Sequence, residues 1–303
     1  MLVDHKVWDE AYKNSPWSTF FSSSQWHKVT QDLGKDASFE WKEIVTPLRE
    51  IKLAKGFLKG YESTLPGVPS GPVALRTPER EVIAEYWREL DKRTRGRFLV
   101  HLRPDSPFKN TEFRTVFIKT HLLKIKDRHK KISENHKRQL RKAQKSGIIV
   151  APARRNEDFK AYLEVYEISL ARWKKRPARI YKEDFFRRIR EIILPENMGC
   201  FFIAWKDRLP QSCALVFFEK KRAVYWHGAS IDEPLAGAGH FLHWSIMEEM
   251  EARGLEVYDF GPSSGLEGVE RFKEGFGAVA EEHLTVVGPA RIFGSYFINS
   301  KTR

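Results

Sequence analysis

The stretch that decides the fold of this chain is residues 225–277, YWHGASIDEPLAGAGHFLHWSIMEEMEARGLEVYDFGPSSGLEGVERFKEGFG. It opens with a strand-like run, passes through the turn Gly237-Ala-Gly239, and continues into a predicted helix with apolar residues along one face. A second strand-like run ends at Asp259-Phe260-Gly261, and a short predicted helix then carries Lys273. We interpret this order as one continuous unit that builds a functional site.

The glycine turn is the first candidate feature of that site. Gly237 and Gly239 let the backbone approach a ligand closely, and the first N–H groups of the following helix have no intrahelical partner. Such a turn could hold a phosphate or another anion. The alternative is that the two glycines only make a tight connection between a strand and a helix. Gly254 is expected to end that helix at its C′ position.

Length and composition set the class of protein. The chain has 303 residues, which is enough for two compact domains. Its two cysteines, Cys200 and Cys213, lie in apolar runs, as is typical of proteins from a reducing compartment. No apolar run approaches the roughly 20 residues that span a bilayer, and acidic residues occupy the N-terminal segment where a secretory signal would be apolar. We therefore expect a cytoplasmic protein.

The pattern of elements predicts the α/β (α+β) class, with two tandem lobes that are each a mixed, mostly antiparallel sheet flanked by helices. The expected N-terminal lobe covers residues 1–126 and the C-terminal lobe covers residues 127–303, with the boundary near Asp127.

Several individual elements are predicted in each lobe. In the first, a helix is expected over residues 24–33 and a strand-like segment over residues 48–58. In the second, three strands joined by short polar connections are expected to form an antiparallel meander, at residues 200–206, 212–219 and 222–229. Ser133 is expected to cap a helix that ends at Gly147.

Positive charge is concentrated in two segments. The net charge is +13, and residues 119–145 hold eleven basic residues against two acids. Residues 171–190 hold nine more basic residues, again against two acids. These segments could form one positive surface for a polyanion such as RNA, or they could be two solvated helix faces. The candidate RNA-binding residues are Lys137, Arg138, Arg141, Lys142, Lys145, Lys174, Lys175 and Arg176.

The sequence contains no convincing Ser-His-Asp or Cys-His arrangement for covalent catalysis. His121, His129 and His136 lie eight and seven residues apart, a spacing that fits neither one helix face nor a zinc finger. We therefore expect no metal site and no tightly bound cofactor. Asp259 and His227 are the ionisable residues at strand ends near the glycine turns, so either could relay a proton. The alternative for Asp259 is that it bonds backbone N–H groups of the following loop.

Several motifs together resemble one family. The segments SENHKRQLRKAQKSGI at 133–148, YWHGAS at 225–230 and YDFGPSS…GVERFKEGFGA at 258–278 are similar to the Fem family of aminoacyl-tRNA-dependent peptide-bridge transferases and to related acyltransferases of the GNAT superfamily. The resemblance implies two tandem GNAT-like lobes with a cleft in or beside the second. One departure concerns coenzyme A: Pro234 stands where acyl-CoA-binding members have Arg or Gln.

The resemblance also implies roles for individual residues. Phe272 and Lys273 match the Phe-Lys pair of the family, so Phe272 is expected to contact substrate, and Lys273 to stabilise the oxyanion or the departing ribose oxygen. Arg172 matches an arginine that holds a phosphate of the acceptor. Tyr181 and Tyr225 fall where acceptor-binding tyrosines are expected.

The function expected from these features is aminoacyl transfer with formation of an amide bond. The donor would be aminoacyl-tRNA, and the acceptor an amine of a cell-wall precursor, a peptide or a small metabolite. One alternative is an N-acyltransferase that uses acyl-CoA. Another is a non-catalytic RNA-binding protein on a GNAT scaffold.

Overall fold

The computed structural model describes residues 3–53, 57–109, 111–172, 179–263 and 265–290. Contacts between residues divide the chain into two compact units, Met1–Lys119 with Glu282–Arg303, and Thr120–Glu281. The expected limit between two domains near Asp127 stays a prediction, because compactness alone does not show which segments fold independently.

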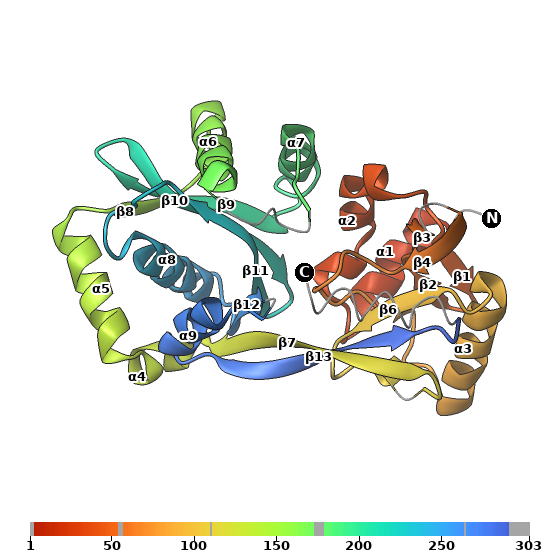
Figure 1. The fold of residues 1–303 in the computed structure, drawn as a ribbon. Coiled ribbons are helices and arrows are strands. Elements are labelled where there is room, and N and C mark those ends of the chain that lie inside the picture. Colours follow the sequence, from red (N-terminus) through yellow and green to blue (C-terminus); the bar gives the residue numbers. More distant parts are fainter. Residues whose placement is uncertain (1–2, 54–56, 110, 173–178, 264, 291–303) are drawn as a thin grey trace. The chain divides into compact units, whose positions relative to one another are not determined.

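In its described residues, the first unit combines three α-helices with two groups of strands (Figure 1). Its α-helices are α1 (His5–Asn14), α2 (Ser24–Val29) and α3 (Arg80–Thr94). One antiparallel sheet has the order β1 (Phe39–Trp41), β2 (Ile44–Thr46) and β5 (Val73–Ala74). The second group pairs in the order β3 (Arg49–Leu53), β4 (Leu58–Glu62), β6 (Phe98–Leu102) and β13 (Val279–Val287). Short 3₁₀ helices lie at Phe20–Ser22, Gln31–Leu33 and Pro107–Lys109.

Two sequence predictions for this unit were wrong in detail. The segment 48–58 contains β3 at residues 49–53, and its last residue, Leu58, begins a second strand, β4, which pairs antiparallel with β3. The helix expected over residues 24–33 ends at Val29, and a 3₁₀ turn follows. At this point the Thr30 hydroxyl donates to the carbonyl oxygens of Trp26 (3.0 Å) and His27 (3.2 Å). A threonine that bonds its own preceding turn offers the backbone an alternative to continued helix.

The second unit is built on a mixed, mostly antiparallel sheet, as predicted. Its strands follow the order β7 (Arg114–Lys124, of which residues 120–124 belong to this unit), β12 (Val257–Pro262), β11 (Arg222–Ser230), β10 (Leu209–Glu219), β9 (Gly199–Lys206) and β8 (Ile149–Pro152). Strands β9, β10 and β11 form the expected antiparallel meander. The pairing of β11 with β12 is parallel.

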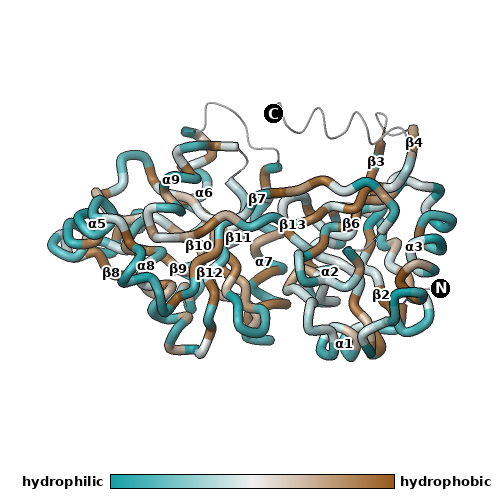
Figure 2. The backbone as a smooth tube through the Cα atoms, turned by 90° about the horizontal axis from the view of Figure 1, so that it is seen from below, coloured by the Kyte–Doolittle hydropathy of each residue, from teal (hydrophilic) through white to brown (hydrophobic). Residues whose placement is uncertain are grey.

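Helices cover both faces of this sheet (Figure 1). They are α4 (Arg128–Lys131), α5 (Glu134–Lys145), α6 (Asn156–Arg172), α7 (Glu183–Ile192), α8 (Ala238–Ala252) and α9 (Glu267–Gly275), with a 3₁₀ turn at Ile125–Asp127. Helices α6 and α7 lie on one face, whereas α8 lies on the other beside α5 and α9. Figure 2 shows that the central strands β9 and β12 carry mainly hydrophobic residues, whereas the outer helix α5 carries mainly hydrophilic ones.

The start of α5 and the end of α8 are set by their local sequences. The Ser133 side chain accepts a hydrogen bond from the His136 N–H at the start of α5. Leu140 and Ala143 of α5 are buried in the same core cluster as Ala238 and Leu242 of α8. Gly254, with a φ of 78°, follows α8 in the left-handed conformation expected at its C′ position. Among the described residues, no helix combines the length and apolar character needed to cross a membrane.

Candidate active site

The two central parallel strands of the second unit separate at their carboxyl ends. Strands β11 and β12 pair only from Arg222 to Val224 and from Val257 to Asp259. Beyond this point β12 continues along β7, whereas β11 stays with β10 as far as Ser230. Beyond Val224 and Asp259, main-chain groups of β11 and β12 therefore no longer pair with each other. The site residues predicted from the sequence lie on both sides of this separation.

A β-bulge in β11 divides the predicted residues between the two faces of the sheet. The register with β10 shifts between Tyr225 and His227, so that Trp226 is an extra residue. Tyr225 packs on His243 of α8, with ring centroids 4.6 Å apart. Its neighbour His227 packs on Tyr166 of α6, at 4.7 Å. Simple alternation would place residues 225 and 227 on the same face, and the bulge separates them.

Lys273 lies on α9 with its ammonium at the separated end of β12. The side chain is buried, at 3% exposed, and Nζ donates to the carbonyl oxygens of Gly261 (2.7 Å) and Pro262 (2.9 Å). Burial lowers the pKa of Lys273 to about 8, although the negative charges of Asp259 and Glu270 act in the opposite direction. Two of the three ammonium donors are thus used, and the group can lose its proton near neutral pH.

Asp259 is also buried, but its oxygen atoms are already engaged. It accepts hydrogen bonds from Thr120 Oγ1 (2.6 Å) and from the Gly261 N–H (2.8 Å), and it forms an ion pair with Arg222 (3.3 Å). These contacts favour the structural alternative for Asp259. The carboxylate fixes the Gly261 turn, and so it positions a carbonyl that holds Lys273.

His227 is held in a nonpolar surrounding. Its Nδ1 lies 2.6 Å from the hydroxyl of Tyr162, and its Nε2 is buried without a hydrogen-bond partner in the part of the chain that the structure describes. Burial lowers the pKa of His227 to about 3. An imidazole with so low a pKa is a poor base for an ammonium near pH 7. The geometry therefore favours hydrogen bonding by a neutral imidazole over proton relay.

Arg172 and Tyr181 lie on the same side of β11 as His227. The exposed Arg172 donates to the Ile231 carbonyl oxygen (2.9 Å) and to Ser230 Oγ (3.0 Å), and so fastens the end of β11. The ring of Tyr181 lies 5.1 Å from that of Trp226. Burial raises the pKa of Tyr181 to about 12, so its hydroxyl is neutral and able to donate a hydrogen bond.

The glycine turn is shaped by helix packing. Gly237 has a φ of 86°, and a Cβ atom at this position would lie 2.2 Å from the carbonyl oxygen of Gln139 on α5. Gly239 has open space around it. The next residue, His240, contacts Phe272 with ring centroids 4.9 Å apart. The start of α8 and the Phe272–Lys273 segment are therefore neighbours, whatever the turn binds.

Sequence reasoning missed a cluster of neutral histidines around Phe272. His136 Nε2 lies 2.8 Å from the Phe272 carbonyl oxygen, and His243 Nδ1 lies 3.0 Å from the Tyr258 hydroxyl. Burial lowers the pKa of His240 to about 4 and that of His243 to about 3. The spacing of His240 and His243 on one helix was the available signal. His136 comes from a different helix, so its place in the cluster could not be read from spacing.

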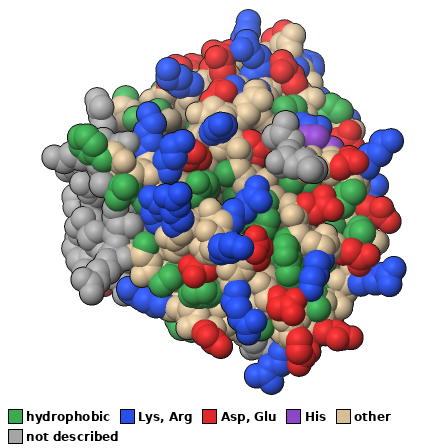
Figure 3. All heavy atoms as spheres, turned by 90° about the vertical axis from the view of Figure 1, so that its right-hand side faces the viewer, with side chains coloured by type: hydrophobic (Ala, Val, Ile, Leu, Met, Phe, Trp, Pro, Cys, Tyr) green, Lys and Arg blue, Asp and Glu red, His purple; other side chains and the backbone are tan. Residues whose placement is uncertain are grey.

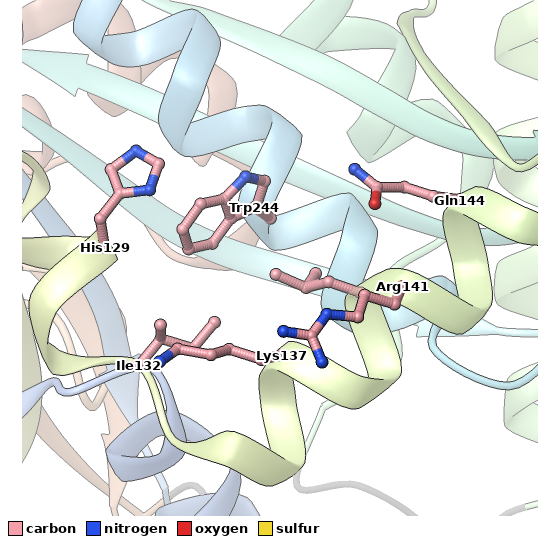
Figure 4. Close-up of a pocket in the computed structure, with 7 residues that line it drawn as sticks. His129, Ile132, Lys137, Arg141, Gln144 and Trp244 are labelled. Carbon is pink, nitrogen blue, oxygen red and sulfur yellow. The ribbon is translucent and has the colours of Figure 1, made fainter.

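The basic residues of α5 divide into two groups. Lys137 and Arg141 line a hollow between α5 and α8 (Figure 4). The exposed residues Arg138, Lys142 and Lys145 are not part of its lining. The predicted residues Lys174, Lys175 and Arg176 lie outside the described residues. By contrast, Figure 3 shows basic and acidic side chains interspersed on the face that carries α3.

Comparison with known proteins identifies the second unit. Residues 130–274 match the family model of the acetyltransferase (GNAT) domain. No curated protein matches the chain by sequence. The segment 130–274 is therefore similar to GNAT acetyltransferase domains, and the expected resemblance to this superfamily is confirmed.

Solved structures extend the similarity to both units. FemX is 12% identical with a TM-score of 0.72, and the match covers 99% of each chain. The C-terminal domain (DUF2156) of a proposed lysylphosphatidylglycerol synthetase from Agrobacterium fabrum is 14% identical with a TM-score of 0.66, covering 98% of this chain and 95% of that one. L-PGS from Bacillus licheniformis is 10% identical with a TM-score of 0.67, covering 99% and 96%. The chain thus has a Fem-like fold.

Proposed function

We propose that this protein is a cytoplasmic aminoacyltransferase that moves an aminoacyl group from aminoacyl-tRNA to an amine. The acceptor is an amine of a cell-wall precursor, a peptide or a small metabolite. The observation that carries the proposal is the buried Lys273 ammonium, which is held by the Gly261 and Pro262 carbonyl oxygens where β11 and β12 separate. The Fem-like fold supports the same reaction class.

The chemistry requires positioning and charge stabilisation but no covalent nucleophile. The acceptor nitrogen attacks the carbonyl carbon of the aminoacyl ester, a C–N bond forms, and the ester C–O bond breaks. The departing ribose oxygen takes a proton, and the amine loses one. Lys273 has one N–H beyond the two bound to carbonyls, and this donor is assigned to the developing oxyanion or to the ribose oxygen.

We assign the acceptor to residues on both faces of the sheet end, Arg172 and Tyr181 on the α6 face and Tyr225 on the α8 face. Both hydrogen bonds of Arg172 go to neutral acceptors, the Ile231 carbonyl and the Ser230 hydroxyl. Its positive charge is therefore not neutralised by these partners and can attract an anionic group of the acceptor. Burial raises the pKa values of both tyrosines, so each hydroxyl keeps its proton and can donate to a carbonyl or phosphate oxygen.

The donor side uses the positive charge of α5. Lys137, Arg138, Arg141, Lys142 and Lys145 follow one another along a single helix, and phosphate neutralisation by such residues dominates binding to nucleic acids. Aminoacyl-tRNA thus acts as a co-substrate, and a tightly bound cofactor has no part in the proposed reaction.

A second candidate is an acyl-CoA-dependent N-acyltransferase. It is favoured by the match of residues 130–274 to the acetyltransferase domain. The site would be the same, with the thioester carbonyl in place of the ester carbonyl. Saturable binding of coenzyme A and product formation without RNA would establish it.

The test is incubation of the protein with a charged pool of total tRNA and a panel of amines, followed by mass spectrometry of the products. The proposal expects an aminoacylated amine that disappears after ribonuclease treatment and in the Lys273→Met variant. Product that resists ribonuclease would assign the reaction to coenzyme A. RNA binding without product from any donor would identify a non-catalytic RNA-binding protein.

A further inference from the structure

The second unit contains a hollow of about 250 Å³ beside two of the basic residues that are assigned to the donor, Lys137 and Arg141. It lies between α4, α5 and α8 and is lined by His129, Ile132, Lys137, Leu140, Arg141, Gln144 and Trp244 (Figure 4).

The hollow has an apolar floor and a polar rim. Ile132, Leu140 and Trp244 form the floor and are nearly buried, at 6%, 8% and 8% exposed. Lys137 and Arg141 belong to the rim. They are four residues apart on α5, and Gln144 follows three further on, so all three lie on one helix face.

The charge of this rim is positive and partly uncompensated. None of the lining residues is acidic. Lys137 is paired with Glu134, whose carboxylate lies 2.7 Å from Nζ. Arg141 makes no hydrogen bond or ion pair within the part of the chain that the structure describes. Arg141 is therefore the cation of this hollow that is available to an anion.

Trp244 is fixed before any ligand arrives. Its indole N–H donates to Glu248 at 2.8 Å, and the guanidinium of Arg128 lies 5.4 Å from the ring centroid. His129 meets the ring edge-on, with centroids 4.9 Å apart. Because the indole N–H is already bonded, Trp244 offers the hollow carbon surface only, and a bound group loses little energy in ordering it.

We propose that this hollow binds one nucleotide of the RNA donor. The base packs against Trp244 and the apolar floor, with its edge toward Gln144 and His129, and the phosphate binds Arg141 and Lys137. A nucleotide combines a flat base with an anionic phosphate, and this combination matches an apolar floor beneath a basic rim. Packing of bases on aromatic side chains is a common mode of RNA recognition. This inference rests on the proposed function, since it places the RNA at a defined point on α5.

The basic residues outside the hollow favour RNA over a small nucleotide. Arg138, Lys142 and Lys145 do not line the hollow, and they extend the positive charge along the exposed side of α5. A continuous phosphate backbone uses both groups of residues, whereas the nucleotide part of coenzyme A would use the hollow alone.

The test compares two arginines of the same helix. Binding of uncharged total tRNA is measured by filter binding for the wild type, Arg141→Gln and the matched control Arg138→Gln. Loss of a charge-assisted contact in the hollow is expected to weaken binding about tenfold, and loss of one exposed phosphate contact only about threefold. Ultraviolet cross-linking with mass spectrometry is expected to place the RNA adduct on a peptide that contains Trp244 or His129.

The result that overturns the inference is equal weakening by the two substitutions, or an adduct away from the hollow. The inference would also be overturned if Arg141→Gln weakened binding of coenzyme A but left binding of tRNA unchanged. The binding assay needs neither an acceptor nor turnover. A protein that binds tRNA through the hollow but yields no product would therefore refute the proposed function alone. An active protein with no preference between Arg141 and Arg138 would refute this inference alone.

Discussion

The ammonium of Lys273 lies 2.7 Å from the carbonyl oxygen of Gly261, and the same glycine donates its N–H to Asp259 at 2.8 Å. One residue of the β12 end thus links the cation to the carboxylate. Asp259 fixes the turn, the turn presents its carbonyl, and the carbonyl holds the ammonium. The cation is therefore positioned by the chain itself before any substrate binds, as electrostatic catalysis requires.

Replacing Lys273 should lower turnover strongly and the stability of the fold only moderately. Lys273→Met keeps the length of the side chain but removes the ammonium, so we expect turnover to fall by about a hundredfold or more. The carbonyl oxygens of Gly261 and Pro262 lose their donor, at a cost of about 1–3 kcal/mol in the free energy of unfolding. Product assays and urea unfolding check both values. Lys160→Met, at an exposed lysine of α6 that the proposed site does not use, is the control.

The pH dependence of turnover should report Lys273. Its pKa is lowered to about 8, so the ammonium is charged below this pH and neutral above it. We expect turnover to fall as the pH rises through about 8. The Lys273→Arg variant keeps its charge in this range and should lack that fall. An unchanged profile in Lys273→Arg would show that another group causes the loss.

The contribution of Lys273 to the stability of the folded protein should rise in alkaline solution for the same reason. The pKa of Lys273 in the folded protein, about 8, is below the ordinary value of 10.5. Between these values the unfolded chain binds more protons than the folded chain, so raising the pH favours the folded state. The difference amounts to about 3 kcal/mol. The thiols of Cys200 and Cys213, whose pKa values burial raises, act in the opposite direction above about pH 9. The gain is therefore read as the difference between the wild type and Lys273→Met in urea unfolding at pH 7.5 and pH 10, and this difference should increase with pH.

The buried histidines should make the second unit sensitive to acid. The pKa values of His227 and His243 are lowered to about 3 and that of His240 to about 4, against an ordinary value of 6.5. The unfolded chain therefore binds more protons than the folded one below pH 6.5, and stability falls as the pH decreases toward 4. The free energy of unfolding, measured between pH 7 and pH 4, should decrease less with falling pH in His243→Phe than in the wild type. Equal slopes would contradict this origin of acid sensitivity.

The two glycines of the turn before and within α8 should behave differently. Gly237→Ala places a Cβ atom against the Gln139 carbonyl at a backbone φ of 86°, and we expect a loss of at least about 2 kcal/mol. Gly239 has open space and lies inside the helix, so Gly239→Ala should leave stability unchanged or raise it by up to about 1 kcal/mol. Thermal unfolding of the two variants distinguishes the positions.

Local patterns predicted most elements of this chain correctly, because they depend on near neighbours. The Ser133 cap, the apolar face of α8 and the left-handed Gly254 each follow from residues within a few positions of one another. The meander of β9, β10 and β11 follows in the same way from alternating runs and short connections. The prediction for segment 48–58 was wrong in detail because a run of strand-forming residues does not show where one strand ends and its partner begins, and here β4 begins at Leu58.

The sequence alone determined the fold class, the family resemblance and the residues on which chemistry could depend. Only the tertiary structure decided how those residues are used. The bulge at Trp226 turns His227 away from Tyr225, and the partners of Asp259 come from β7 and β11. Packing of α5 on α8 separates Arg141 from Arg138. Periodicity fixes which face of an element is buried, whereas the partner that meets that face is set by long-range packing.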